Sequence, residues 1–322
     1  MGRNHSPGIG IAAAAVMQAE QIARRVYRLR TLMVNVYFVA DTESPQRWML
    51  VDTGMRGYAG VIRREARKLF GARPAAIVLT HGHFDHVGGL PRLADEWRVP
   101  VYAHPLELPY LTGRSPYPPP DPTVGGGSQS WISPLYPRGP IDLENRVEML
   151  PQRGGVPGFA DWRWLSTDGH TPGHVSLFRE QDRTLIAGDA VVTTRQESTI
   201  NVLLQREVVW RPPAYYTSDW SAARRSVEML ARLEPEVLAT GHGHVLRGAT
   251  MRAALWALAD RFDEAMPSGG RYVPYPAVAD ERGVVHVPPR PGIALTAANL
   301  AVGVTAIAAS LALIALARKF EV

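Results

Sequence analysis

The chain has 322 residues, 46% of them hydrophobic, and a formal net charge of +5. This length and apolar content indicate a folded enzyme with one large domain rather than a binding tail. The basic residues are scattered without a run of five or six, so no nucleic-acid partner is expected. Cysteine is absent, which excludes disulfides, thiolate metal ligands and a cysteine nucleophile.

Residues 1–29 are expected to form a helical N-terminal segment. Within it, residues 9–17 are apolar and follow Arg3, a pattern that resembles a weak signal-peptide core. No good small-x-small cleavage site follows. We therefore expect a helix that packs on the domain or lies at a membrane surface, with a signal peptide as the alternative.

The main domain is expected to span residues 30–265, followed by a linker at 266–292. Strands at 34–39 and 48–51 are predicted to pair, with polar residues between them as the turn. A basic amphipathic helix at 58–70 is predicted to end at Gly71. The same reasoning predicts further strands at 75–79, 99–103, 162–166, 174–178, 184–187 and 236–240, and helices at 88–97, 221–233 and 249–263.

Residues 112–140 contain eight prolines and five glycines, so no regular secondary structure is expected there. Long segments of this kind are usually either functional or disordered. We interpret this one as an ordered flap beside the site, with Trp131 and Tyr136 as its apolar contacts. A flexible insertion without function is the alternative.

Residues 293–317 carry no charge and lie between Arg290 and Arg318. A helix of this length would rise about 37 Å at ~1.5 Å per residue, enough to cross the ~30 Å core of a bilayer. We therefore expect a transmembrane helix, which makes the protein membrane-associated with its main domain in the cytoplasm. A buried or dimer-forming helix in a soluble cytoplasmic protein is the alternative.

Seven of the ten histidines lie in three short clusters, the first of which is Thr80-His81-Gly82-His83-Phe84-Asp85-His86. Imidazole nitrogen and carboxylate oxygen are the ligands that zinc and similar divalent ions prefer. Alternate residues of an extended segment point to the same side, so His81 and His83 can face one ion. The turn that follows can bring Asp85 and His86 to a second ion.

Three further segments place an acid or a histidine after a predicted strand. They are Gly169-His170-Thr171-Pro172-Gly173-His174, Gly188-Asp189 and Gly241-His242-Gly243-His244. Ligands of open α/β folds commonly gather at the carboxyl ends of strands. The four segments together therefore predict one site for two metal ions.

The order His-x-His-x-Asp-His, Gly-His-Thr, Gly-Asp and Gly-His, with the early turn Val51-Asp52-Thr53-Gly54, resembles the metallo-β-lactamase-fold hydrolases over residues 30–262. The glyoxalase-II-like and lactonase-like branch is the most similar. The resemblance implies an α/β fold, a four-layer αβ/βα sandwich of two packed mixed sheets with helices outside, to which this chain adds its C-terminal apolar helix. It implies that His81, His83 and His170 bind one metal, that Asp85, His86 and His242 bind the other, and that Asp189 bridges the two.

Three neighbouring residues are expected to support the ligands from outside. Asp52 would hold the turn 81–86 through hydrogen bonds, because such outer partners orient metal ligands. His174 would act from a similar position, with replacement of His170 as a ligand as the alternative. His244 is expected to be a loop histidine near the mouth of the site, with polarisation of a substrate carbonyl or proton donation as the alternative.

Such a site predicts a hydrolase of small molecules. A hydroxide shared by two divalent ions, zinc in the first place with iron or manganese as alternatives, would attack a carboxylic ester, thioester or lactone. Asp85 would orient that hydroxide besides binding metal. Asp189 argues against the zinc β-lactamases, which usually carry Cys or Ser at this position, and the chain lacks the basic and aromatic run with which glyoxalase II binds glutathione.

Two other activities of the same fold are the alternatives. A phosphodiesterase is disfavoured because the chain has no dedicated basic arm. An iron-dependent oxidoreductase similar to persulfide dioxygenases would use one metal, through the equivalents of His81, His170 and Asp189. The presence of Asp85, His86 and His242 argues against that second alternative. The sequence carries no indication of an oligomeric state.

Overall fold

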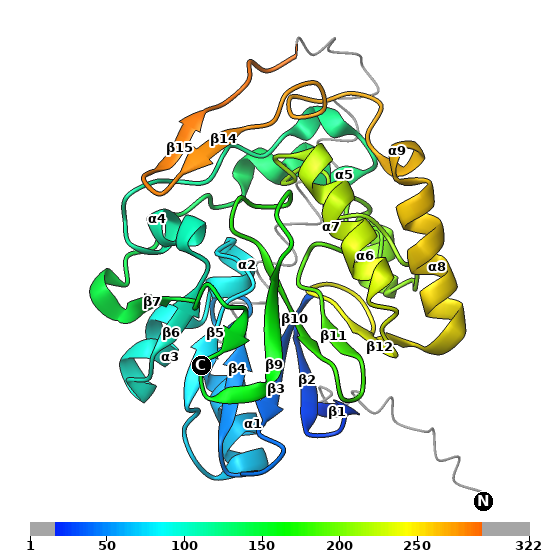
Figure 1. Cartoon of the computed structure of the whole chain (residues 1–322). Helices are drawn as coiled ribbons and strands as arrows, with labels where there is room; N and C mark the ends of the chain where they lie inside the picture. The colour runs from blue at the N-terminus through cyan, green and yellow to red at the C-terminus, as the bar shows by residue number, and fades with distance from the viewer. Residues whose placement is uncertain (1–16, 292–322) are drawn as a thin grey trace, which may run out of the picture.

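The computed structural model describes residues 17–291, in which two mixed β-sheets pack face to face with helices on both outer sides (Figure 1). The first sheet has seven strands within this range, in spatial order: β1 (Glu20–Ala23), β2 (Val26–Thr31), β3 (Val34–Ala40), β4 (Trp48–Val51), β5 (Ala76–Val78), β6 (Val101–Ala103) and β7 (Val147–Met149). The described part of the second sheet has six, in spatial order: β13 (Leu246–Arg247), β12 (Val237–Ala239), β11 (Thr184–Ile186), β10 (Val175–Arg179), β9 (Phe159–Ser166) and β8 (Gly155–Val156). The helices are α1 (Ala59–Phe70), α2 (Phe84–Val87), α3 (Leu90–Trp97), α4 (Leu108–Leu111), α5 (Ser128–Ile132), α6 (Thr199–Leu204), α7 (Trp220–Arg232), α8 (Gly248–Asp260) and α9 (Phe262–Ala265).

Both faces of the inner strands are covered, which explains their nearly continuous apolar sequences. All seven residues of β3 are buried. Tyr37 and Val39 point between the two sheets, where they share a core with Trp162 and Leu177 of the second sheet. The alternate residues of β3 face the opposite way, toward the helices, because successive side chains of a strand point to opposite faces.

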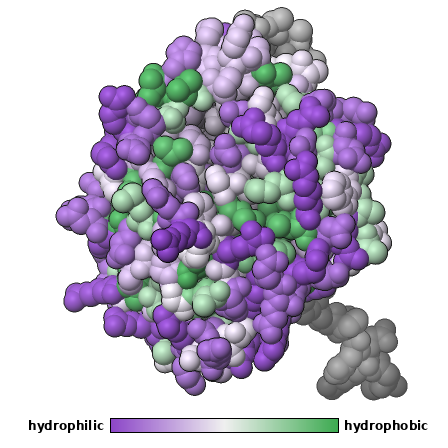
Figure 2. Space-filling view, in the orientation of Figure 1, coloured by the Kyte–Doolittle hydropathy of each residue, from purple (hydrophilic) through white to green (hydrophobic). Residues whose placement is uncertain are grey.

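Two outer cores attach the helices to the sheets. Ile62 of α1 and Leu93 of α3 pack on the first sheet, and Val227 of α7 and Leu255 of α8 pack on the second. The three apolar layers together make the four-layer αβ/βα sandwich that the sequence predicts. The face shown in Figure 2 is mostly hydrophilic, as expected when large apolar side chains are used in these cores.

Parallel pairing brings several strand ends to one edge of the sandwich. β4, β5, β6 and β7 pair in parallel, as do β11 and β12. The loops that follow β5, β11 and β12 therefore begin at the carboxyl ends of these strands, which lie at the same edge of the sandwich. These loops carry most of the histidines and acids singled out from the sequence.

Most elements predicted between residues 34 and 263 are confirmed, but the helical N-terminal segment is wrong where it can be checked. Residues 20–23 and 26–31 form β1 and β2, and β2 pairs with β3 along its whole length. The rest of that prediction, residues 1–16, lies outside the described residues, as does the predicted transmembrane segment 293–317. Among residues 17–291, no helix is long and apolar enough to cross a membrane.

Two segments expected to lack regular structure contain some. The flap, residues 112–140, includes α5 and 3₁₀ turns at Pro122–Val124 and Ser133–Leu135. The expected linker, residues 266–292, carries the hairpin β14 (Val278–Asp280) and β15 (Gly283–His286). This segment is held to the flap, since the Val284 amide donates to Ser115 Oγ at 3.2 Å and the Tyr272 hydroxyl donates to the Pro119 carbonyl at 2.6 Å.

The close approach of Gly88, which follows α2, to the loop before α1 generates a stability prediction. A Cβ atom at Gly88 would overlap the backbone nitrogen of Arg56. We expect Gly88→Ala to lower the apparent free energy of unfolding by about 1–3 kcal/mol, the usual cost of overpacking. Gly60→Ala is the matched control, because no atom lies within 4 Å of its added methyl group and the residue is in α1. It should instead stabilise by about 0.5–1 kcal/mol. Urea denaturation measures both, and equal effects would contradict the close packing at Gly88.

Candidate metal centre

Four loops from the two sheets meet at the edge where β5, β11 and β12 end. Backbone hydrogen bonds join them: Val175 N donates to Thr80 O at 2.9 Å, and Gly241 N donates to Gly188 O at 2.8 Å. Asn35 N of β3 donates to Gly241 O at 2.8 Å, which ties the loop after β12 to the first sheet. The loops are thus held as one unit before any side chain is considered.

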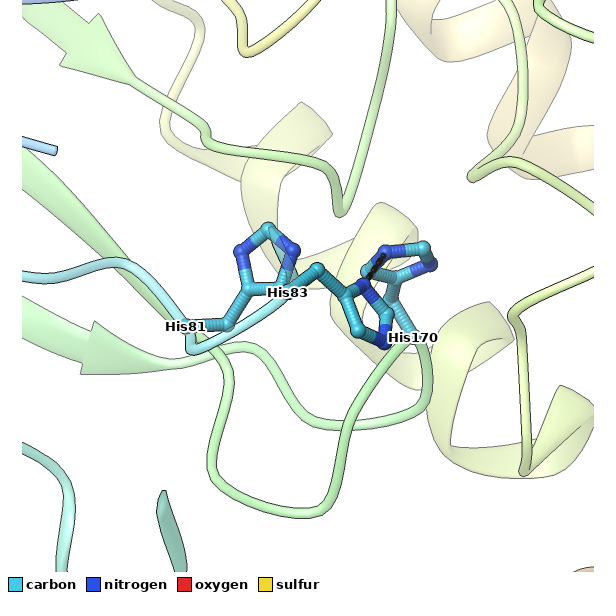
Figure 3. Close-up of side chains that lie close together, drawn as sticks. All are labelled: His81, His83 and His170. Carbon is cyan, nitrogen blue, oxygen red and sulfur yellow. Dashed lines mark hydrogen bonds between the residues drawn. The ribbon is translucent and has the colours of Figure 1, made fainter. Parts of the chain in front are cut away.

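All seven ligands named from the sequence lie together in this unit. Three groups of three have ligand atoms within 4.8 Å of one another: His81, His83 and His170; His81, His86 and Asp189; and Asp85, His86 and His242. The first and third groups are the two triads that the family resemblance implies. Figure 3 shows the first triad, in which His83 Nδ1 and His170 Nε2 face each other at 3.0 Å.

Asp189 lies between the two triads. Its Oδ1 is 3.5 Å from His86 Nε2, and its Oδ2 is 3.5 Å from His170 Nε2 and 3.1 Å from His242 Nε2. The carboxylate fits there because residue 241 is glycine, and a Cβ atom at this position would overlap Asp189 Oδ1. One buried carboxylate therefore contacts imidazoles from three different loops.

The remote nitrogens of three rings are anchored by partners outside the cluster. His86 Nδ1 lies 2.8 Å from Asp52 Oδ2, His242 Nδ1 lies 2.9 Å from the Met33 carbonyl, and His170 Nδ1 lies 3.4 Å from Thr217 Oγ1. Asp52 also accepts hydrogen bonds from the amide and the hydroxyl of Thr80, at 2.8 and 2.7 Å. Such outer contacts fix the tautomer and orientation of a metal-binding histidine.

The inward atoms of the cluster suit a cation. His81 Nε2, His86 Nε2 and Asp189 Oδ1 are buried without a hydrogen-bond partner among the described residues. Unsatisfied buried polar atoms are costly, so several of them pointing at one another call for a bound group. Because the converging atoms are imidazole nitrogens and carboxylate oxygens, these residues could hold a divalent metal ion.

The charge state of the cluster agrees with this role. Burial lowers the pKa of the His81 and His83 imidazoles well below their ordinary value and that of His170 to about 4, so these rings are neutral at neutral pH. Burial alone would raise the pKa of Asp189, but His242 and His86 outweigh it and hold this pKa well below its usual range. Burial likewise opposes protonation of His86, yet Asp189 and Asp52 raise its pKa well above the ordinary value. A bound metal ion would supply the positive charge that the proton on His86 brings in the metal-free protein, and it would displace that proton.

His174 and His244 differ in their surroundings. His174 is fully buried, and its Nε2 accepts a hydrogen bond from the Asp189 amide at 2.9 Å. Its Nδ1 therefore carries the proton and donates to Thr167 Oγ1 at 2.8 Å. Both nitrogens are occupied, so His174 positions Asp189 and is not available as a ligand. The His244 ring is half-buried and belongs to none of the three groups in the part of the chain that is described.

Glu107 is a residue of this site that the sequence analysis missed. It lies in a 3₁₀ turn (Pro105–Glu107) after β6 and is fully buried. One carboxylate oxygen accepts hydrogen bonds from the Gly82 amide, at 2.9 Å, and the Tyr117 hydroxyl. The other accepts from the Gly173 amide at 2.9 Å and the Thr171 hydroxyl at 2.7 Å. Glu107 thus clamps the loop of His81 and His83 to the loop of His170. A single acid in an apolar stretch after a predicted strand was the available signal.

Aromatic side chains cover the cluster. The His83 ring lies between Tyr117 and Tyr216, with ring centroids at 4.6 and 4.3 Å. Tyr136 of the flap packs against Phe84 at 5.5 Å and Tyr216 at 6.3 Å, as expected for an ordered flap beside the site. Trp131, the other flap residue named from the sequence, is half-buried on α5.

Comparisons with known proteins agree with this arrangement. The model of the metallo-β-lactamase superfamily matches residues 29–242. The chain is 46% identical over 243 residues to the probable metallo-hydrolase YflN of Bacillus subtilis, a match that covers 75% of this chain and 92% of that protein. It is 28% identical over 210 residues to the probable metallo-hydrolase YybB of the same organism, which covers 65% of this chain and 80% of that protein.

The fold is also seen in a solved structure. BJP-1, a subclass B3 metallo-β-lactamase of Bradyrhizobium japonicum, is similar with a TM-score of 0.53 and 20% sequence identity, over 78% of this chain and 94% of that chain. At this identity the similarity concerns the fold alone.

The clamp formed by Glu107 generates a prediction about metal affinity. In Glu107→Ala the four donors on the two ligand loops lose their shared acceptor, so the loops should separate. We expect metal affinity to fall about 10–100-fold, as it does when outer partners of ligands are removed. Competition with a chelator measures this, and Glu107→Gln, which keeps one acceptor oxygen, should lose less.

Glu281→Ala is the control, because this glutamate is exposed at the turn of the β14–β15 hairpin. If Glu107→Ala lowered thermal stability but bound metal as the unchanged protein does, Glu107 would only support the fold.

The buried His174 predicts a pH dependence of stability in the metal-free protein. Burial lowers its pKa to about 3, whereas an imidazole in the unfolded chain titrates near pH ~6.5. Between these values the unfolded chain binds a proton that the folded protein does not, so acidification favours unfolding. His174→Gln should make the fall in stability from pH 6.5 to 4 shallower, by up to ~1.4 kcal/mol per pH unit. An unchanged slope in denaturation at several pH values would show that His174 already accepts a proton in the folded protein.

Proposed function

Because the chain belongs to the metallo-β-lactamase superfamily and gathers seven metal-binding side chains in one buried cluster, we propose that it is a hydrolase with two divalent ions, zinc in the first place, acting on carboxylic esters, thioesters or lactones. The observation that carries the proposal is the convergence of two complete triads on Asp189. The relatives described as probable metallo-hydrolases support hydrolysis as the reaction class.

The ligands divide between the two ions as the triads do. His81, His83 and His170 would hold one ion, Asp85, His86 and His242 the other, and Asp189 both. When bound, the two ions would lower the pKa of a water molecule. Their positive charge would also stabilise the negative charge on the oxygen of the bond that is cleaved.

Asp85 is the ligand closest to solvent. Its side chain is 13% exposed, whereas the side chains of His242 and Asp189 beside it are 2% and 3% exposed. A substrate would therefore approach from the side of Asp85. Burial raises the pKa of the Asp85 carboxyl in the metal-free protein, whereas a bound cation would favour the carboxylate, which can accept a hydrogen bond. We assign it the orientation of the attacking water molecule, through a hydrogen bond to its carboxylate.

The surroundings of the cluster favour a carbonyl over a phosphoryl group at the point of attack. Enzymes that transfer phosphoryl groups commonly clamp them with arginine or lysine. Within residues 17–291, no lysine or arginine hydrogen-bonds to any of the seven ligands. Tyr117 and Tyr216 contact the His83 ring instead, and Tyr136 packs on Tyr216. Apolar rings at this place would strengthen electrostatic interactions in the site by lowering the local dielectric constant.

The proposal is tested by metal analysis of the purified protein together with turnover of a small panel: a thioester, a lactone, a p-nitrophenyl ester and a p-nitrophenyl phosphodiester. We expect about two zinc ions per chain and hydrolysis of at least one carbonyl substrate in preference to the phosphodiester. Asp189→Ala should fold, but its kcat should be lower by a factor of about 10²–10³, the usual effect of removing one charge-stabilising group.

Asp260→Ala at the exposed end of α8 is the matched control and should keep its activity. One iron ion per chain together with consumption of oxygen would contradict the proposed hydrolase and indicate a redox enzyme. Unchanged turnover in Asp189→Ala would refute a mechanism that depends on two ions.

A further inference from the structure

A cavity lies beside the turn that carries His81 to His86, with a volume of about 890 Å³. One wall is formed by the loop before α1, by α1 itself and by the first turn of α3. The other is formed by Pro137 of the flap and by Ile141. Phe84, the residue next to Asp85, lines the cavity as well. We call this cavity the arginine groove, after Arg56, Arg63, Arg64 and Arg92, which line it.

The charge of the arginine groove is only partly compensated. Among the described residues, no aspartate or glutamate lines it. Arg63 and Arg64 are paired with Glu96 and Glu65, which lie outside the lining. Arg56 and Arg92 are exposed, and the guanidinium group of neither has a hydrogen bond or an ion pair with any described residue. Two guanidinium groups on one groove are therefore free to bind an anion.

The position of Arg56 is fixed by the same turn that carries the metal ligands. Gly88 packs directly on the backbone of Arg56, and Gly54 forms a β-bridge with Val87. Arg92 is the third residue of α3. The groove and the metal-binding turn are thus parts of one rigid packing arrangement.

Phe84 connects the groove to the metal centre. Its ring packs on Tyr136 at 5.5 Å, and Tyr136 in turn packs on Tyr216, which covers His83. A molecule bound at both places, with its scissile bond at the ligand cluster, would have to extend past this aromatic wall to reach the groove. The apolar side chains of Val61, Pro91 and Ile141 would contact its carbon chain, and the arginines would meet its far end.

We propose that the arginine groove binds a phosphate at the far end of the leaving group, so that the substrate is an ester or thioester whose alcohol or thiol carries a distal phosphate. This inference rests on the proposed function for the position of the scissile bond. Arginine matches phosphate because its planar guanidinium donates two parallel hydrogen bonds and stays charged at all relevant pH values. The arginines lie beyond Phe84 and make no hydrogen bond to the ligand cluster, so the phosphate is recognised and is not the group attacked.

The test uses two thioesters that differ by one phosphate, S-acetylpantetheine and S-acetyl-4′-phosphopantetheine, with the metal-loaded full chain. We expect kcat/KM to favour the phosphorylated thioester by about tenfold or more, as a charge-assisted hydrogen bond allows. The double variant Arg56→Gln/Arg92→Gln should lose this preference and hydrolyse S-acetylpantetheine as before. Arg225→Gln is the control, because this arginine is exposed on α7 of the other half of the sandwich.

Binding of a thioether that cannot be hydrolysed, S-methyl-4′-phosphopantetheine, separates this inference from the proposed function. If it binds to the unchanged protein about tenfold more tightly than to the double variant while no thioester is cleaved, the groove is supported and the proposed reaction is not. If the two proteins bind it equally, the groove proposal is overturned whatever is hydrolysed. Arginine-dependent binding of a single-stranded RNA oligonucleotide that the thioether does not displace would also overturn it, in favour of an RNA surface.

Discussion

The site depends on one buried carboxylate, Asp189, which contacts imidazoles from three loops that are far apart in the chain. A charge without water is stable only where opposite charges or hydrogen bonds replace its hydration. The histidines replace the hydration of Asp189 with hydrogen bonds and positive charge. The carboxylate of Asp189 in turn stabilises the cations or protons that the histidines hold. The packing of the two sheets matters for function because it brings those loops to one edge.

The ligand loops are oriented from outside by groups that do not face the metal positions. Asp52 holds His86, the Met33 carbonyl holds His242, and Glu107 joins the loop of His83 to that of His170. These contacts are buried, so each hydrogen bond that is lost leaves a polar atom unsatisfied. Positioning and stability therefore rest on the same interactions, so changes in this outer layer are expected to lower both metal affinity and the stability of the fold.

Around this centre the surface divides into two chemical environments. Tyr117 and Tyr216 contact the His83 ring, while the arginine groove beyond Phe84 is charged. An aromatic wall strengthens the electrostatics of a reacting group, whereas exposed arginines attract a distant anion in a manner sensitive to salt. The arrangement suits a substrate with a reactive carbonyl at one end and a fixed charge at the other.

The sequence by itself determined which side chains are candidate metal ligands, since the spacing in residues 80–86 and the acid or histidine after each later strand are local features. It did not reveal β1 and β2, because β2 is stabilised by pairing with β3, and β1 by pairing with β2, and not by their own composition. Nor did it reveal the role of Glu107 or of the arginine groove, because both depend on segments that are distant in the chain. Glu107 and Gly173, for example, are 66 residues apart. Local chemistry can be read from the order of residues, whereas clamps and grooves exist only once distant segments are packed together.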